Sequence, residues 1–143
     1  MQAFRERFRY FNTFGGNPVS AAAALATLRV VQEEGLQENA RVVGEYARDG
    51  LRELATRHEC IGDVRGSGLF FGAEMVLDRG TKEPATAFTK RVANAMRQQG
   101  ILLNFLGIHY NVLKIRPPLP FSREKADQLI ETLDRVLAET PLA

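Results

Sequence analysis

The spacing of the hydrophobic residues changes along this chain, and this change constrains the fold more than any other feature of the sequence. Between residues 36 and 58, apolar side chains recur at helical spacing and predict an amphipathic helix. They are Leu36, Ala40, Val43, Ala47, Leu51 and Leu54. From residue 61 the helical period is lost, and residues 61–64 and 69–76 are predicted as two short strands around the glycine-broken sequence Arg65-Gly66-Ser67-Gly68.

Helical spacing returns over residues 85–100, ending at a glycine, which commonly terminates a helix. Two further strands are predicted at residues 101–105 and 111–116. Pro117-Pro118 ends the second one, because proline donates no ladder hydrogen bond and disfavours a helix directly before it. The last helix is predicted to begin after Ser122, which can cap it. This order predicts an α+β fold, with a small, mostly antiparallel sheet of three to four strands and helices packed on one face.

A long, alanine-rich helix is predicted ahead of this part. Asn17 can accept hydrogen bonds from the free N–H groups of the first turn, and Pro18 suits the first helical position because it has no N–H to leave unsatisfied. We expect the helix to end at about Gly35. Residues 1–35 are interpreted as an N-terminal arm with an interdomain or interface helix, and residues 36–143 as a small domain.

The composition argues against several classes of partner. With 143 residues the chain is long enough for one compact domain. Its 19 Lys and Arg barely outnumber its 17 Asp and Glu, so the net charge of +2 gives no strong field for nucleic acid or anionic lipid. Arg5, Arg7 and Arg9 alternate with aromatic residues, as in a half-buried segment, and we interpret residues 4–11 as a solvated or interface strip and not as a nucleic-acid patch. We expect no nucleic-acid partner.

Cysteine usage and hydropathy indicate the compartment. Cys60 is the one cysteine and cannot form an internal disulfide, and no cysteine or histidine cluster has metal-ligand spacing. No charged and apolar leader opens the chain, and no apolar stretch reaches the ~18 to 20 residues needed to span a bilayer. We therefore expect a cytoplasmic protein with no metal site and no membrane partner.

Thr13 is the first candidate for binding chemistry. A hydroxyl followed by Gly15, Gly16 and a helix N-terminus suits a phosphate group, since glycine permits close approach and backbone donors can converge there. The same residues also suit a simple turn before the helix. Chemistry alone favours that second interpretation.

Arg116 is the second candidate. In an extended strand Val112, Lys114 and Arg116 share one face, so two cations stand together at the strand end. The guanidinium of arginine offers a planar fork that suits a carboxylate. A solvated strand edge is an equally good interpretation of the residues alone.

Arg65 is interpreted mainly as structural, tying a tight turn together with Asp63, and Gly66 as part of the same turn. Glu74 could be the partner of a cation. His58 and His109 are given no catalytic role, although His109 and Tyr110 could line a substrate entrance. Cys60 is interpreted as a small core residue.

Three stretches together resemble one enzyme family. They are Phe11 to Pro18 before the alanine-rich helix, Asp63 to Phe70 with Gly72 and Glu74, and Lys114 to Leu119. Across essentially the whole chain, their order and spacing resemble the C-terminal small domain of class III pyridoxal-phosphate-dependent aminotransferases of fold type I. Within that family the chain looks closest to the subgroup that includes ethanolamine-phosphate phospho-lyases.

The resemblance implies roles for several residues. Thr13 is expected to hydrogen-bond the phosphate of the pyridoxal phosphate held by the partner subunit of a homodimer, with Gly15, Gly16 and Asn17 as its scaffold. Arg116 is expected to bind the substrate carboxylate, and Arg65 with Gly66 to be structural. Family members are about three times as long as this chain, and the lysine that holds the cofactor lies upstream of the matching region. The chain therefore carries no catalytic residue in this interpretation and is expected to be inactive alone.

Three functions follow from these residues. The first is transfer of an amino group between an amino acid and a 2-oxo acid, in the enzyme of which this chain is a part. The second is a pyridoxal-phosphate lyase that eliminates phosphate from an amino-alcohol phosphate. Arginine at position 116 favours transamination, because some phospho-lyases of the subgroup carry lysine there. The third is a freestanding interaction module with the small-domain fold.

Overall fold

The computed structural model describes residues 2–142, except for the side chains of residues 2, 3 and 5. The chain divides into two compact units, Met1–Leu36 and Gln37–Ala143. The interdomain or interface role of residues 1–35 stays a prediction.

The first unit holds α1 (Gln2–Arg7) and α2 (Pro18–Glu33). The predicted cap of α2 is confirmed, because Oδ1 of Asn17 accepts hydrogen bonds from the backbone N–H groups of Val19 (2.9 Å) and Ser20 (3.1 Å). Gly35 follows the helix with φ +61°, a left-handed conformation that glycine adopts without strain.

The described side chains of residues 4–11 are exposed, which agrees with a solvated strip, whereas the interface alternative stays a prediction. Residues 2–7 are helical, so the alternation of arginine and aromatic residues does not divide them between two faces. The side chains of Phe4, Phe8, Tyr10 and Phe11 are between 48% and 89% exposed. The described side chains of α2 are also exposed, except for the half-buried Val31.

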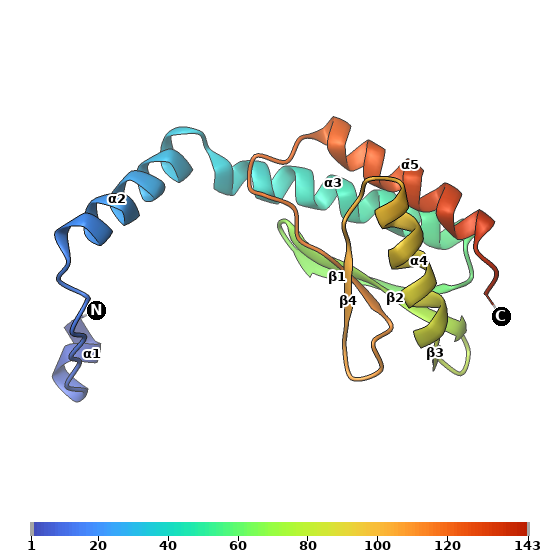
Figure 1. The fold of residues 1–143 in the computed structure, drawn as a ribbon, viewed down its shortest axis with the longest axis horizontal. Helices are drawn as coiled ribbons and strands as arrows, with labels where there is room; N and C mark the ends of the chain where they lie inside the picture. Colours follow the sequence, from blue (N-terminus) through green and yellow to red (C-terminus); the bar gives the residue numbers. More distant parts are fainter. Residues whose placement is uncertain (1, 143) are drawn as a thin grey trace. The chain divides into compact units, whose positions relative to one another are not determined.

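The second unit is an α+β fold, as predicted (Figure 1). Its elements are α3 (Leu36–Arg57), β1 (Ile61–Ser67), β2 (Phe70–Asp78), β3 (Glu83–Pro84), α4 (Thr86–Gln98), β4 (Asn104–Leu106), β5 (Val112–Ile115) and α5 (Arg123–Glu139). The sheet has the order β1-β2-β5-β4, all pairs being antiparallel, and the two-residue β3 pairs with β2. This short strand is the addition to the three or four strands expected.

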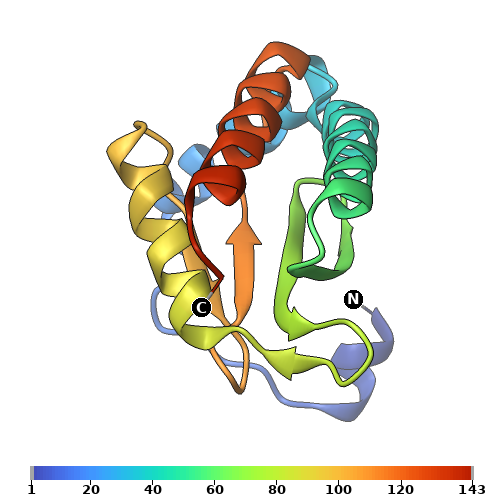
Figure 2. The same cartoon turned by 90° about the vertical axis from the view of Figure 1, so that its right-hand side faces the viewer.

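The helices α3, α4 and α5 lie over one face of the sheet (Figures 1 and 2). The register places Phe71 opposite Ile115 and Ala73 opposite Leu113, and all four side chains are buried in the core beneath the helices. Because side chains alternate along a strand, the residues between them lie on the opposite face. That face of the sheet, called the open face below, carries Asp63, Arg65, Gly72, Glu74, Val112 and Lys114.

Two predicted boundaries differ from the structure. β1 continues through Ser67, so Arg65 and Gly66 lie within a strand and the turn is formed by Gly68 and Leu69. The strand predicted from residue 101 begins only at Asn104. A single sequence predicts strand ends poorly because pairing with the partner strand decides them.

Candidate functional site

Lys114 lies on the open face within β5, and Arg116 follows directly after this strand. Leu113 and Ile115 are buried beneath the helices, whereas Lys114 is half-buried and Arg116, directly after the strand, is exposed. The predicted alternation therefore describes this strand correctly. Among the described residues, neither Lys114 nor Arg116 forms a salt bridge within the chain.

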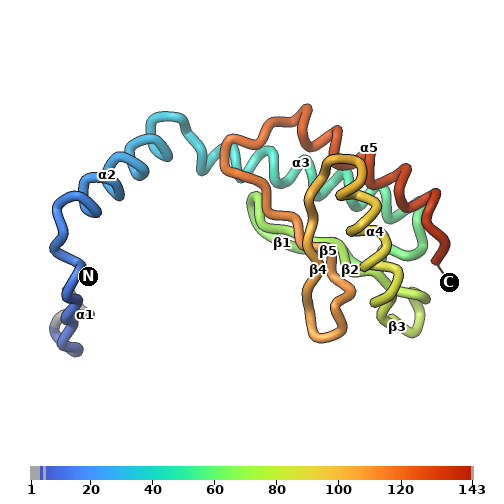
Figure 3. Tube along the Cα trace, in the orientation of Figure 1, coloured from blue at the N-terminus to red at the C-terminus, as the bar shows by residue number. Residues whose placement is uncertain are grey.

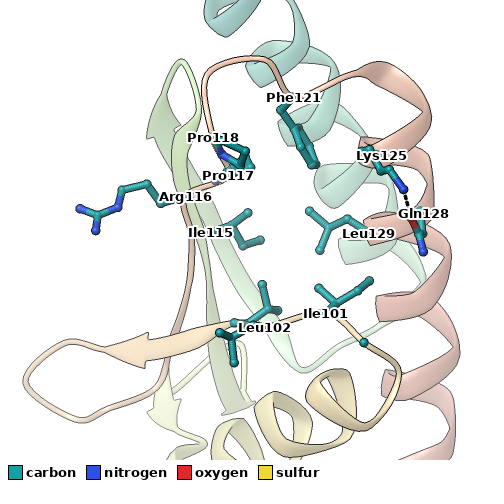
Figure 4. A pocket seen from close by; sticks show the side chains of 12 residues that line it. Ile101, Leu102, Ile115, Arg116, Pro117, Pro118, Phe121, Lys125, Gln128 and Leu129 are labelled. Atoms are coloured by element: carbon teal, nitrogen blue, oxygen red, sulfur yellow. Dashed lines mark hydrogen bonds between the residues drawn. The ribbon is translucent and has the colours of Figure 1, made fainter. Parts of the chain in front are cut away.

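A cavity of about 440 Å³ lies on the helix side of β5 and is lined mostly by apolar side chains. Its lining includes Ile101, Ile115, Phe121 and Leu129. Figure 4 shows the guanidinium group of Arg116 directed away from these side chains. Arg116 contributes to the wall of this cavity, but its guanidinium group points away from it.

A second pocket of about 440 Å³ lies on the open face and is called the open-face pocket. It is lined by Arg65, Gly66, Ser67, Phe70, Phe71, Gly72, Leu106, Gly107, Val112 and Lys114. The register runs from Arg65 through Gly72 to Lys114 across three strands. A Cβ at Gly72 would lie 2.7 Å from the carbonyl oxygen of Leu113. Because Gly72 has no side chain, the surface between Arg65 and Lys114 consists of backbone.

Arg65 pairs with two carboxylates on the same face. Its Nη1 atom donates to Oδ2 of Asp63 (2.7 Å) and to Oε2 of Glu74 (2.5 Å) on the neighbouring strand. These hydrogen bonds, the one to Glu74 most strongly, raise the pKa of Arg65 above its ordinary value. Arg65 was predicted to tie a tight turn together, and the structure instead places it inside β1, bridging two strands.

Gly66 has φ +148°, and a Cβ there would overlap the backbone of Phe70 and Phe71. Only glycine fits this position without a backbone shift. The turn that follows is fixed by a residue for which sequence analysis gave no role. Arg48 of α3 is 6% exposed, and its Nη1 donates to the carbonyl of Gly68 (2.9 Å). An arginine on the apolar stripe of a helix was the signal that could have revealed it.

Thr13 lies in an exposed turn before α2. In that turn the N–H of Phe14 donates to Oδ1 of Asn12 (3.1 Å) and the N–H of Gly15 donates to the carbonyl of Asn12 (3.2 Å). The Thr13 hydroxyl has no hydrogen-bond partner among the described residues. The N–H groups of the first helical turn that were expected to help bind a phosphate are already occupied by Asn17.

The residues of this turn still fit a phosphate oxygen. Gly16 has open space where a Cβ would stand, so an anion can approach the backbone closely. The exposed hydroxyl of Thr13 offers a hydrogen-bond donor beside it. Thr13 belongs to the first unit and Arg116 to the second.

The remaining candidate residues are His58, Cys60, His109 and Tyr110, and the structure shows contacts for the first two that suit a structural role. Nε2 of His58 lies 2.5 Å from Oδ1 of Asp134 on α5. Burial raises the pKa of the Cys60 thiol, which disfavours the nucleophilic thiolate. His109 and Tyr110 are exposed in the β4–β5 connection, where the Thr86 hydroxyl donates to the carbonyl of His109 (2.5 Å).

Neither a metal cluster nor a membrane span is found in the described part of the chain. No group of three or more histidine, cysteine, aspartate or glutamate side chains among residues 2–142 is placed to hold a metal ion. No described helix combines the length and apolar character needed to cross a bilayer.

Comparison with known proteins decides the family. The model of the family described as aminotransferase class-III matches residues 1–137, nearly the whole chain. This chain belongs to that family. Its sequence resemblance to class III aminotransferases is thereby confirmed, and the motifs that carried it lie in both units of the structure.

Two relatives of this chain carry different reactions in their names. The chain is 50% identical over 128 residues to the mitochondrial alanine–glyoxylate aminotransferase 2 homolog 2 of Arabidopsis thaliana, covering 90% of this chain and 27% of that protein. It is 46% identical over 129 residues to the ethanolamine-phosphate phospho-lyase homolog 1 of Caenorhabditis elegans, covering 90% and 28%. The chain therefore spans less than a third of the length of these relatives.

A solved class-III structure agrees with the fold. A phospholyase from Arthrobacter, in complex with phosphoethanolamine, superposes with a TM-score of 0.88 and 46% sequence identity. The match covers 98% of this chain and 33% of that one. The proteins that this chain matches are therefore named for two reactions, amino-group transfer and phosphate elimination.

Proposed function

We propose that this chain is the small-domain part of a pyridoxal-phosphate enzyme that transfers an amino group between an amino acid and a 2-oxo acid. The observation that carries the proposal is the pair Lys114 and Arg116 at the end of β5, without an ion-pair partner among the described residues. Both substrates of such a reaction carry a carboxylate, which a guanidinium fork can bind with two hydrogen bonds. The family membership supports the cofactor.

In this proposal, the residues of the chain bind and orient while the cofactor supplies the chemistry. Pyridoxal phosphate, when bound, withdraws electrons from the bond that breaks. The Thr13 hydroxyl donates a hydrogen bond to the phosphate of the cofactor in the partner subunit of a homodimer. Arg116 holds the substrate carboxylate, with Lys114 adding positive charge beside it. Asn17 and Gly16 keep the Thr13 turn in the conformation that exposes the hydroxyl.

The chain contributes no catalytic residue in this proposal. We place the lysine that holds the cofactor in a part of the family's length that the chain does not span, so the chain alone is expected to be inactive. We also expect the enzyme to work in the cytoplasm. The word mitochondrial in the name of the Arabidopsis relative makes an organelle the alternative to test.

A phospho-lyase is the second candidate function. The 46% identity to both the Caenorhabditis and the Arthrobacter proteins favours it. Arg116 favours transamination only through the resemblance, because some phospho-lyases of the subgroup carry lysine there, whereas a guanidinium binds a phosphate as readily as a carboxylate. The two proposed reactions therefore differ in the anionic group of the substrate that Lys114 and Arg116 would contact.

Steady-state kinetics of the enzyme that contains this chain would test the proposal. Arg116→Gln should raise the KM for the amino-acid donor by roughly 10- to 100-fold, as expected for the loss of a charged hydrogen bond of about 1.5–3 kcal/mol. Lys114→Gln should have a smaller effect, because an ammonium lacks the bidentate geometry. Lys90→Gln, on an exposed part of α4, is the matched control.

Two results would contradict the proposal. One is an unchanged KM for the amino acid in the Arg116→Gln enzyme. The other is release of phosphate from phosphoethanolamine by an enzyme that transfers no amino group to any 2-oxo acid, which would establish the phospho-lyase instead.

A further inference from the structure

We propose that Arg65 is a positioning residue for anion binding, because it pairs with Asp63 and Glu74 and so reduces the repulsion that their negative charges would exert on an anion at Lys114 in the open-face pocket. The ligand class is a small organic molecule that carries a phosphate or a carboxylate. The proposal rests on the proposed function in one respect, namely that the β5 side of the open face meets an anionic group of the substrate.

The ion-pair geometry is the first support. One nitrogen of Arg65, Nη1, lies 2.7 Å from the Asp63 carboxylate and 2.5 Å from the Glu74 carboxylate. Asp63 and Glu74 are cross-strand partners, so the two negative charges stand side by side at the end of the arginine side chain. A single guanidinium therefore pairs with both carboxylates and offsets one of their two negative charges.

The lining of the open-face pocket is the second support. Arg65 and Lys114 both line the pocket, and no carboxylate is among its described lining residues. Gly72 lies between the two cations in the register and has no side chain to fill the gap. Phe70, Leu106 and Val112 add apolar surface, which suits the organic part of a small ligand.

The spacing across the strands places the carboxylates of Asp63 and Glu74 close enough to Lys114 to affect the binding of an anion there. Glu74 lies opposite Val112, two residues from Lys114 on β5. Diagonal neighbours of this kind are about 7–8 Å apart, which is within the ~10 Å screening length at 0.1 M salt. Without Arg65, the negative charges of Glu74 and Asp63 would act on Lys114 and on any anion near it.

Binding of inorganic phosphate to the 143-residue chain tests this charge arrangement directly. Backbone amide shifts of Gly72 and Lys114 would be followed by NMR at pH 7 and constant low ionic strength. We expect Arg65→Met to weaken phosphate binding by about 5-fold or more, since a few nearby charges change anion affinity by that order. Adding Asp63→Asn and Glu74→Gln to Arg65→Met removes both negative charges and should restore the affinity to at least that of the original chain.

The triple variant distinguishes a positioning role of Arg65 from a role as a direct ligand or as a structural residue only. If the triple variant binds phosphate as weakly as Arg65→Met alone, Arg65 is a direct ligand or only a structural residue, and the proposal is overturned. An absence of phosphate-dependent shifts at Gly72 and Lys114 in the unaltered chain would overturn it as well. Lys114→Gln should abolish the shifts, whereas Lys90→Gln should leave them unchanged. Thermal unfolding of each variant checks that the fold is retained.

The failure of the proposed function would look different. In that case the kinetics of the Arg116→Gln and Lys114→Gln enzymes would be unaffected, while phosphate binding to the chain would still weaken with Arg65→Met and recover in the triple variant. The reverse combination, altered kinetics without charge rescue, would overturn the role of Arg65 and leave the proposed function standing.

Discussion

Single glycines decide how closely the α3 helix approaches the sheet. A Cβ at Gly44 would overlap the backbone carbonyl of Gly68, in the turn that joins β1 to β2. The same carbonyl accepts the hydrogen bond from the buried Arg48. Gly44 and Arg48 together therefore hold the hairpin that carries Arg65 against α3.

Gly44→Ala should destabilise the chain by about 1–3 kcal/mol, the usual cost of inserting atoms into a packed site, because backbone atoms cannot rotate away. Urea unfolding followed by circular dichroism measures the free energy of unfolding. Gly50→Ala on the same helix is the control, since its Cβ would meet only the flexible end of Ile130 and alanine favours the helix. Equal losses in the two variants would contradict the role given to the Gly68 carbonyl.

At the scale of elements, α3 and α5 are joined by polar contacts along their length. They run side by side (Figure 3). The Tyr46 hydroxyl donates to Asp127 (2.5 Å), and at the far end Asp134 of α5 accepts from Arg57 (2.7 Å) and meets His58. The hydrogen bond with His58 is the main cause that lowers the pKa of Asp134, and Arg57 lowers it further.

A lowered carboxyl pKa fixes the sign of the pH dependence. The ionised Asp134 stabilises the folded chain above its unfolded-state pKa of about 3.9, and this stability is lost as the pH falls through the folded pKa. Asp134→Asn should therefore lower the free energy of unfolding at pH 6 by about 1 kcal/mol or less, with a difference from the unaltered chain that shrinks below pH 4. Urea unfolding at several pH values measures this.

Glu131→Gln, on the same helix, is the control for Asp134→Asn. Glu131 makes no ion pair in the described part of the chain, so its replacement should not reproduce the pH-dependent difference. A gap between the unaltered chain and Asp134→Asn that stays constant down to pH 2 would mean that the ion pairs of Asp134 do not contribute to stability.

At the scale of the whole molecule, the buried core belongs to the second unit. The buried cluster runs from Val43 to Leu137, whereas the aromatic residues before α2 and the described side chains of α2 are largely exposed. These exposed residues flank in sequence the turn that carries Thr13, whose hydroxyl acts on the other subunit in the proposed homodimer.

Thr13→Val in the enzyme that contains this chain should therefore weaken retention of pyridoxal phosphate by roughly 10- to 100-fold, corresponding to one hydrogen bond to a charged group. Thr13→Ser keeps the hydroxyl and should retain the affinity. Cofactor released on dilution, measured by fluorescence, gives the dissociation constant without an activity assay. Equal retention by the valine and threonine enzymes would assign Thr13 to the turn alone.

Features that depend on neighbours in sequence could be predicted. The caps formed by Asn17 and Ser122, and the separation of Lys114 from Leu113 by strand alternation, follow from atoms only a few residues apart. The α+β class followed in the same way from the change of hydrophobic period. Most of the fold, and the presence of cations on one face of β5, could therefore be anticipated.

The rest required the tertiary structure. Strand register decides that Arg65 meets Glu74 nine residues away and that Gly72 separates it from Lys114. Helix packing decides that His58 meets Asp134 and that Arg48 reaches Gly68. The sequence by itself determined which residues cap, alternate and turn, because those choices are local. Only the folded chain decided which charges compensate one another, because residues far apart in sequence become neighbours through packing.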